Sequence, residues 1–145
     1  MKVMIVLAYD HGAWEKFEIV KSLLEGRGIE YEVFASKEYD ALDSFAVFAR
    51  EANEKVKSGA IGIYGCRSGI GMSMASNKAR GVRGALCFNE KIAEMSRLHN
   101  NSNVCILPCD YITDDDVVSI VEKFLATEFL GGKYQARIDE LEEIK

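Results

Sequence analysis

Short apolar runs alternate with amphipathic stretches along this chain, and this alternation constrains the fold more than any other feature. Each run is nearly continuous, which is typical of strands that are buried on both faces. The five runs are Val3–Ala8, Tyr31–Ala35, Ala60–Tyr64, Gly84–Phe88 and Val104–Leu107. Between them, apolar residues recur three or four positions apart, which predicts helices. Strands that alternate with helices predict an α/β fold, a doubly wound five-stranded parallel sheet of Rossmann-like type.

The length of the chain fits a single domain. Its 145 residues lie within the usual range for one compact unit, and 48% hydrophobic residues supply a core. We therefore expect one domain over residues 1–145. The Gly131-Gly132 pair ends the regular pattern, so residues 131–145 are expected to form a charged helical tail that leaves the body.

Composition argues against several classes of function. A net charge of −5 makes nucleic acid an unexpected partner, because nucleic-acid binders usually carry a basic face. The apolar start, Met1–Ala8, is too short to span a membrane and lacks the layout of a signal peptide. None of the four cysteines, Cys66, Cys87, Cys105 and Cys109, belongs to a CxxC pair. We therefore expect free thiols, no metal site and a cytoplasmic protein.

The most informative loop is Gly65–Ser73, with the sequence GCRSGIGMS. Its small residues let amide N–H groups converge on an anion, and the helix predicted to follow adds positive potential. The glycine spacing does not match a dinucleotide-binding fingerprint. Met72 stands where a Walker loop needs lysine and where a cysteine-phosphatase loop needs arginine. What remains is the Cys66 thiol beside Arg67 at a helix start, a setting that favours a thiolate.

A buried cysteine after a strand is also a common core residue, and on residue type alone the two interpretations of Cys66 are equally good. The glycines that surround Cys66 favour the functional one. The other three cysteines lack that setting, so we interpret them as core. In parallel sheets ligands bind beyond the carboxyl ends of the strands, so Tyr9–Gly12, Gly65–Gly71 and Pro108–Asp110 are expected to form the functional rim.

His11 and His99 are the only histidines. Asp10-His11 follows the first predicted strand, where Asp10 could equally serve as a helix cap. His99-Asn100 ends a predicted helix, where a histidine is often only a partner of the helix dipole. An imidazole beside amide groups also suits proton transfer to a sugar oxygen.

The tail places Lys133 and Arg137 four residues apart, on one face of its predicted helix. Two cations on one face can clamp a phosphate. The alternative is a solvated face paired with Asp139 or Glu140, which is the commoner fate of such charges.

Together these segments resemble the ribose-5-phosphate isomerase B and galactose-6-phosphate isomerase family over essentially the whole chain. The matching segments are Asp10–Gly12, Cys66–Lys78, Gly81–Cys87, His99–Val104 and Phe129–Arg137. The resemblance implies an aldose–ketose isomerase that acts on phosphorylated sugars, of the ribose 5-phosphate and ribulose 5-phosphate type, through an enediolate. It implies no metal or other cofactor. It also implies a homodimer or homotetramer with sites between subunits, in which residues 131–145 pack on a neighbouring subunit.

The resemblance further implies a role for each matching residue. Cys66 would be the base that takes the proton from the sugar carbon, and Ser68 and His99 would serve ring opening and proton handling. The expected substrate-binding residues are Asp10 and Asn100 for hydroxyls, His11, Lys133 and Arg137 for the phosphate, and the amides of Arg67, Gly69, Ile70 and Gly71 for the enediolate.

Several positions depart from the family pattern. Arg67 stands where the family usually has glycine, Asp110 where it has arginine, and Tyr134 where it has histidine. Asp43 is followed by Ser-Phe in place of Tyr-Pro. We expect Arg67 to replace the charge lost at Asp110. Two alternatives stay open: the same chemistry on a tetrose or hexose phosphate or an unphosphorylated sugar, and a catalytically weak sugar-phosphate-binding protein.

Overall fold

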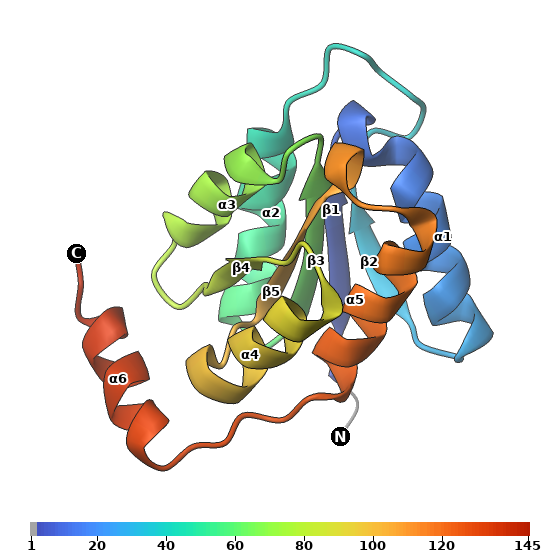
Figure 1. The fold of residues 1–145 in the computed structure, drawn as a ribbon. Helices are drawn as coiled ribbons and strands as arrows, with labels where there is room; N and C mark the ends of the chain where they lie inside the picture. Colours follow the sequence, from blue (N-terminus) through green and yellow to red (C-terminus); the bar gives the residue numbers. More distant parts are fainter. Residues whose placement is uncertain (1–2) are drawn as a thin grey trace.

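The computed structural model describes residues 3–145 and places a parallel sheet between two layers of helices (Figure 1). The strands are β1 (Ile5–Tyr9), β2 (Tyr31–Phe34), β3 (Ile61–Cys66), β4 (Gly84–Leu86) and β5 (Val104–Pro108). Their order across the sheet is β2-β1-β3-β5-β4, and every pair is parallel. The predicted five-stranded, doubly wound parallel sheet is therefore confirmed.

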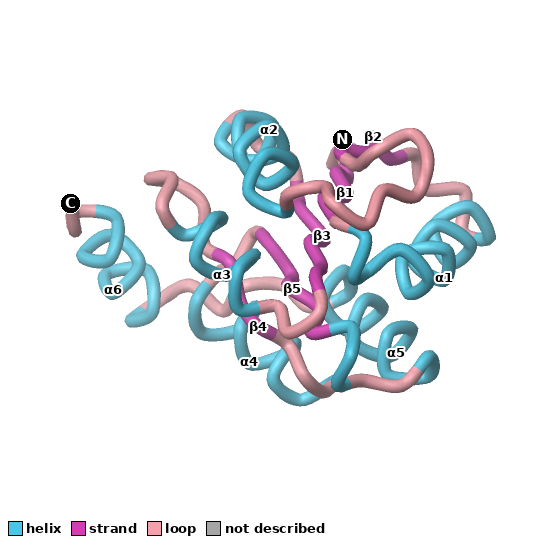
Figure 2. The backbone as a smooth tube through the Cα atoms, turned by 90° about the horizontal axis from the view of Figure 1, so that it is seen from above, coloured by secondary structure: helices cyan, strands magenta, loops and turns pink. Residues whose placement is uncertain are grey.

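Six helices and two 3₁₀ turns connect the strands. They are η1 (His11–Ala13), α1 (Trp14–Gly26), α2 (Phe45–Lys57), α3 (Ile70–Asn77), α4 (Glu90–Asn100), η2 (Cys109–Tyr111), α5 (Asp114–Ala126) and α6 (Lys133–Glu142). Helices α1, α4 and α5 cover one face of the sheet, and α2 and α3 cover the other (Figure 2). Within residues 3–145, no helix combines the length and the apolar character that crossing a membrane requires.

Each face of the sheet has its own core, which explains the continuous apolar runs of the strands. On one face, Phe17 and Leu24 of α1 pack with Phe124 of α5 against alternate strand residues. On the other face, Ala52 of α2 and Met72 of α3 pack against the sheet. All five residues of β1 are buried, since this strand is covered from both sides.

The third strand runs further than its apolar run predicts. The prediction ended it at Tyr64, whereas β3 continues through Cys66. The reason is pairing: Gly65 lies between Tyr9 of β1 and Leu107 of β5, so a strand still flanks it on each side. Cys66 therefore belongs to the ladder rather than to a loop.

The tail helix stands apart from the three layers (Figure 1, red). Its end is nevertheless tied to the body through Glu142. This carboxylate accepts hydrogen bonds from Arg83 Nη1 at 2.8 Å and from the amide of Gly81 at 3.0 Å. The tail thus leaves the three layers, as predicted, and Glu142 ties its end back to the body.

Tyr64 of β3 donates a hydrogen bond from its hydroxyl to Oδ1 of Asn53 in α2 at 2.8 Å, and both residues are buried. The substitution Tyr64→Phe leaves that buried oxygen without its donor. We expect the free energy of unfolding to fall by about 1–3 kcal/mol. Urea denaturation followed by circular dichroism measures the loss.

The matched control is Tyr31→Phe, because Tyr31 also donates its hydroxyl to a side chain, Glu25, but at an exposed position. Solvent can replace that bond, so a loss below about 1 kcal/mol is expected. Equal losses for the two variants would contradict burial as the reason.

Candidate active site

The segments that follow β1, β3 and β5 meet at the carboxyl edge of the sheet, where the sequence predicted the functional rim. Tyr9 pairs with Gly65, so Asp10 and Cys66 are the next residues along two neighbouring strands. On its other side, Cys66 pairs with Pro108. The turn η1 packs closely against the loop that follows β3. A Cβ at Gly12 would lie 2.3 Å from Arg67 Cγ and 3.1 Å from the Arg67 amide nitrogen, so a larger residue at position 12 would force Arg67 to move.

Cys66 ends β3 with 6% of its surface exposed. It packs in the core beneath α2 and α3, beside Met72 and Tyr64. The residue that follows, Arg67, is exposed, so the thiol lies just below the rim rather than deep in the interior. The start of α3 is three residues further on, and a helix start stabilises an anion nearby.

The loop between Cys66 and α3 is held by local interactions. Ser68 Oγ accepts a hydrogen bond from the amide of Ile70 at 3.2 Å, which fixes the turn into the helix. Gly69 has a φ of +76°, a conformation that residues with a side chain rarely adopt. A Cβ at Gly69 would also lie 2.5 Å from Leu86 Cδ1. The loop has one well-defined shape as a result.

Arg67 and Asp110 form an ion pair across the rim. Arg67 Nη1 lies 3.3 Å from Asp110 Oδ2, and the Asp110 amide donates to the Arg67 carbonyl at 2.8 Å. The negative charge of Asp110 therefore partly neutralises the positive charge of Arg67. The expectation that Arg67 replaces the charge lost at Asp110 for an anionic ligand stays a prediction, since this contact involves no ligand.

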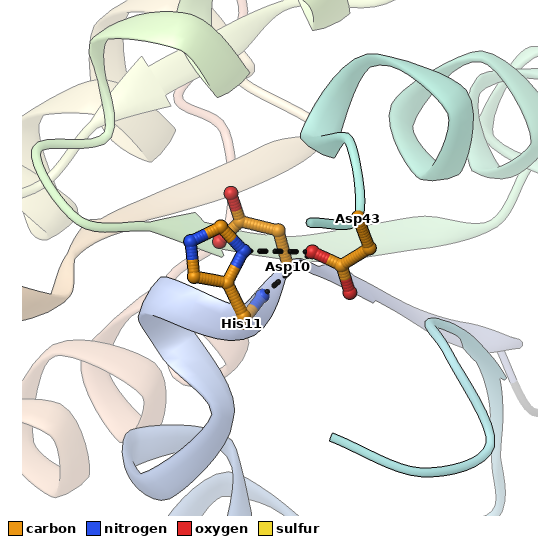
Figure 3. A group of neighbouring side chains, drawn as sticks. All are labelled: Asp10, His11 and Asp43. Carbon is orange, nitrogen blue, oxygen red and sulfur yellow. Dashed lines mark hydrogen bonds and ion pairs between the residues drawn. The ribbon is translucent and has the colours of Figure 1, made fainter. Parts of the chain in front are cut away.

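Asp10, His11 and Asp43 form a compact cluster beside this rim (Figure 3). Asp10 Oδ1 accepts the Gly12 amide at 3.0 Å, and His11 Nδ1 lies 2.9 Å from Asp43 Oδ1. Burial raises the pKa of Asp10, against the lowering effects of the Gly12 amide and His11. Each of the three side chains has one atom that could bind a metal ion, and these three atoms lie within 4.8 Å of one another. Because the His11 nitrogen is already bonded to Asp43, these contacts account for the cluster without a metal ion.

Sequence reasoning noted Asp43 only as a match to a family and gave it no role. The sequence does show that Asp43 lies in the loop after the second strand. Since Asp10 follows the first strand, a parallel sheet places both residues at the same edge. What the sequence could not give is the contact with His11, which is 32 residues away.

His99 and Asn100 lie at the opposite edge of the sheet from Cys66. They end α4, and α4 leads into the start of β5, whereas Cys66 pairs with the last residue of β5. A five-residue strand separates the two edges by ~16 Å. A single chain therefore does not bring the three predicted catalytic residues together.

The predicted cations of the tail gather near His99 rather than near Cys66. The His99 ring stacks on Tyr134, with centroids 4.6 Å apart and planes inclined by 19°. Lys133 Nζ lies 5.3 Å from the centroid of the same ring, and Arg137 Cζ lies 5.7 Å from it. Tyr134, to which the sequence assigned no role, thus holds an imidazole and two cations in one group.

Two pockets formed by residues 3–145 also lie away from Cys66. One, of about 650 Å³, opens at the amino ends of β1 and β2 and is lined by Ile5, Tyr31 and Phe124 among others. The second, of about 360 Å³, lies between α6 and the 77–84 loop and is lined in part by Asn100. Neither is lined by Cys66, and Asn100 in the second is the only predicted site residue that lines either of them.

Comparison with known families gives a match over almost the whole chain. The model of the family described as Ribose/Galactose Isomerase matches residues 5–141. The probable ribose-5-phosphate isomerase B of Mycoplasma genitalium is 35% identical over 144 residues, which cover 97% of this chain and 95% of that protein. Ribose-5-phosphate isomerase B of Escherichia coli is 31% identical with the same coverage.

Solved structures show the same similarity. A ribose 5-phosphate isomerase from Thermotoga maritima superposes with a TM-score of 0.93 and 37% identity, over 99% of this chain and 100% of that one. The Mycoplasma genitalium ribose-5-phosphate isomerase B, solved with bound ribulose-5-phosphate, has a TM-score of 0.93 and 35% identity, over 97% and 95% of the two chains.

The raised pKa of Asp10 makes a prediction about stability. The native state holds the Asp10 proton more tightly than the unfolded chain, so above the native pKa the ionised carboxylate costs stability. Asp10→Asn removes that cost and keeps an oxygen for the Gly12 amide. We expect the free energy of unfolding at pH 7 to rise by about 1 kcal/mol. The gain should shrink as the pH falls through the native pKa and vanish below the ordinary value of 3.8.

Denaturation of both proteins between pH 3.5 and 8 measures this difference. Asp110→Asn is the control, because Asp110 lies at the same rim but is exposed and paired with Arg67. Its effect should stay within about 0.5 kcal/mol. A loss of stability in Asp10→Asn at pH 7 would contradict the prediction.

Proposed function

This chain belongs to the ribose/galactose isomerase family as an aldose–ketose isomerase of phosphorylated sugars, and we propose that Cys66 is the base of its reaction. The proposed substrate pair is ribose 5-phosphate and ribulose 5-phosphate, on the strength of the relatives named for it. The observation that carries the proposal is the position of Cys66: it ends the central strand β3, beside Asp10 and four residues before the first residue of α3.

The proposed reaction is a proton transfer between neighbouring carbons. The Cys66 thiolate takes the proton from C2 of the open-chain aldose, and the electron pair left behind forms the enediolate with the carbonyl. The thiol then returns a proton to C1 while the hydroxyl proton on O2 passes to O1, which gives the ketose with its carbonyl at C2. Negative charge develops on oxygen, where the amides of Arg67, Gly69 and Gly71 and the start of α3 would stabilise it, whereas the Ile70 amide already donates to Ser68 Oγ. Ser68 Oγ accepts from Ile70 and so keeps its own hydrogen for a sugar oxygen.

The other three cysteines lie away from this position or are held protonated: a hydrogen bond with Cys105 lowers the pKa of Cys87, but Cys87 packs in the core on the opposite face of the sheet from Cys66. Cys87, Cys105 and Cys109 are free and buried. Burial raises the pKa of Cys109 to about 12 and holds the pKa of Cys105 well above its ordinary value. Both therefore stay protonated at neutral pH. Free thiols of this kind fit the cytoplasmic location that we propose for the chain.

A second copy of the chain completes the proposed site. The half with Cys66 and Asp10 lies at the carboxyl edge of the sheet, and the half with His99 lies at the amino edge. Next to Cys66, α3 exposes Ile70 by 54% and Met74 by 64%. Such an apolar face suits contact with another subunit. A two-fold dimer that pairs the two halves would contain two identical sites.

In this dimer, cations from two chains would hold the substrate phosphate. His11 would come from the subunit that supplies Cys66, and Lys133 and Arg137 from the other, together with Asn100 for a hydroxyl. Guanidinium and ammonium groups that converge from two sides suit a phosphate dianion. A second candidate substrate is an unphosphorylated sugar, because the Asp110 carboxylate lies at the same rim as Arg67 and reduces the positive potential available to a phosphate there.

Removal of the proposed base should abolish turnover. For Cys66→Ala we expect kcat to fall by about 10²–10⁴-fold, the range that general-base catalysis contributes. The assay follows conversion of ribose 5-phosphate, and NMR in heavy water follows exchange of the C2 proton. The control is Cys87→Ala, which removes another buried thiol and should leave kcat within about twofold. Turnover that survives Cys66→Ala would exclude the assigned base.

Mixed dimers test whether the site is shared. Cys66→Ala and His99→Asn should each be inactive alone. If the two residues act from different chains, a mixed dimer has one site with both residues intact, and a statistical mixture should recover about a quarter of the wild-type activity. The control mixes Cys66→Ala with Asp10→Asn, which lie in the same half and should not complement. Absence of recovery in the first mixture would contradict the shared site.

A further inference from the structure

Helix α6 carries two of the residues proposed to hold the phosphate, Lys133 and Arg137, yet little of the helix is buried. Its buried residue is Ile138, with 5% of its surface exposed. Further along, Leu141 is 44% exposed and Ile144, just beyond the helix, is 71% exposed. Apolar burial therefore does not hold the end of α6, and polar contacts must set where that end lies.

Glu142 supplies these polar contacts. Its Oε1 accepts a hydrogen bond from Arg83 Nη1 at 2.8 Å, and its Oε2 accepts one from the amide of Gly81 at 3.0 Å. Both carboxylate oxygens thus have a donor, and one of the donors is charged. The side chains of Arg83 and Glu142 are only 18% and 30% exposed. Charge-assisted hydrogen bonds with this little access to water are stronger than an ion pair on the open surface.

The turn that receives Glu142 is itself held to the edge of the sheet. Asn103, directly before β5, accepts the Arg83 amide through Oδ1 at 2.7 Å. The same side chain donates from Nδ2 to the Gly81 carbonyl at 2.9 Å. Both donors to Glu142 therefore belong to one short turn whose backbone is fixed, so the end of α6 is tied to a firm support.

Arg83 also contacts the end of the helix that carries His99 and Asn100. Its Nε donates to the carbonyl of Asn101, the first residue after α4, at 2.9 Å. Asn101 has a φ of +45°, the left-handed conformation in which chains commonly leave a helix. One guanidinium thus joins the end of α4 to the end of α6. Each of these two helices carries residues proposed to contact the substrate.

The start of α6 meets α4 as well. The amide of Leu130 donates to the carbonyl of Leu98 at 3.2 Å, and the ring of Tyr134 stacks on that of His99 with centroids 4.6 Å apart. These contacts fix one end of α6, and the contacts of Glu142 fix the other. A helix attached at both ends keeps one orientation, so both of its cations are presented in one direction.

We propose that Glu142 is a positioning residue: through Arg83, it holds α6 so that Lys133 and Arg137 converge on one phosphate group. The proposal rests on the function proposed above, because the phosphate comes from there. Glu142 itself touches no substrate. It acts by fixing the cations before the ligand arrives, which removes the cost of ordering them on binding.

A simpler role would be to anchor the end of the chain for stability alone. The two roles differ in their effect on phosphate binding. By charge alone, loss of a carboxylate from a helix with two cations strengthens the binding of an anion. Loss of position weakens it, and a mere anchor leaves it unchanged. The sign of the change in phosphate affinity therefore separates the three cases.

The first measurement is the position of α6, read from the NMR signals of the His99 ring. The ring current of the stacked tyrosine shifts these signals, and Tyr134→Leu gives their position without the stack. The chain has two histidines, so His11→Gln assigns them. At alkaline pH, where imidazole is neutral, we expect Glu142→Gln to move the His99 signals toward their position in Tyr134→Leu. Glu143→Gln removes the same charge from an exposed neighbour and should leave them in place.

The second measurement is phosphate affinity. Glutamine keeps the shape of Glu142 but has one accepting oxygen for two donors. We expect Glu142→Gln to raise KM for ribose 5-phosphate about three- to tenfold, with kcat within about twofold, because binding is lost equally in the ground and transition states. The dissociation constant of inorganic phosphate, followed through the His99 signals, should rise by the same factor. Glu143→Gln should leave both constants within about twofold.

Further variants show whether the effect passes through the two cations. In a background with both Lys133→Gln and Arg137→Gln, the change Glu142→Gln should add less than about twofold to KM. Glu142→Asp keeps the charge but shortens the side chain by one methylene, so it cannot reach both donors. It should raise KM in the same direction, and it serves if Glu142→Gln does not fold.

Each result decides one question. Unmoved His99 signals in Glu142→Gln overturn the proposal, and so does unchanged or tighter phosphate binding. An undiminished effect in the background without both cations also overturns it, since Glu142 would then act elsewhere. A wild-type protein that binds inorganic phosphate without turning over ribose 5-phosphate would instead refute the proposed substrate. Weaker phosphate binding in Glu142→Gln would in that case still support the role of Glu142.

Discussion

Parallel pairing of β1, β3 and β5 brings the chemistry of this protein together. Because the three strands run in one direction and in register, their last residues arrive at one edge, and Asp10, Cys66 and Pro108 become neighbours. The helices that follow begin at the same edge, which adds their positive ends to it. Neither the thiol nor the carboxylate needs a dedicated loop to reach the site, since hydrogen bonds of the sheet already fix their backbone.

Two carboxylates at this edge are held in different ways. Asp10 accepts one amide and is otherwise desolvated, so burial raises its pKa. Asp43 is buried as well, but it accepts three hydrogen bonds that satisfy both of its oxygens. The first pattern leaves a carboxylate able to bind a further donor, such as a sugar hydroxyl. The second leaves little capacity for a ligand and suits support of a neighbour.

The direction of the crossovers explains why one chain carries only half of the proposed site at each edge. Every helix that packs on a parallel sheet runs back against the strands, so the end of α4 and the start of β5 share the amino edge. His99, near the end of α4, therefore lies at the amino edge, with Tyr134 stacked on its ring. In the proposed dimer, a symmetric second copy would offer its amino edge without any change of fold, so that a small sheet could surround the substrate.

Local pattern alone determined the strands, most helix positions and the loops that form the rim. These follow from side-chain periodicity and strand direction, which operate over a few residues. Strand order, the pairing of Arg67 with Asp110 and the contact of His11 with Asp43 came only from the tertiary structure. Those partners are 43 and 32 residues apart, and nothing in the sequence gives the distance between them. The tertiary fold determines these distances, because the burial of both faces of the sheet fixes where each loop lies.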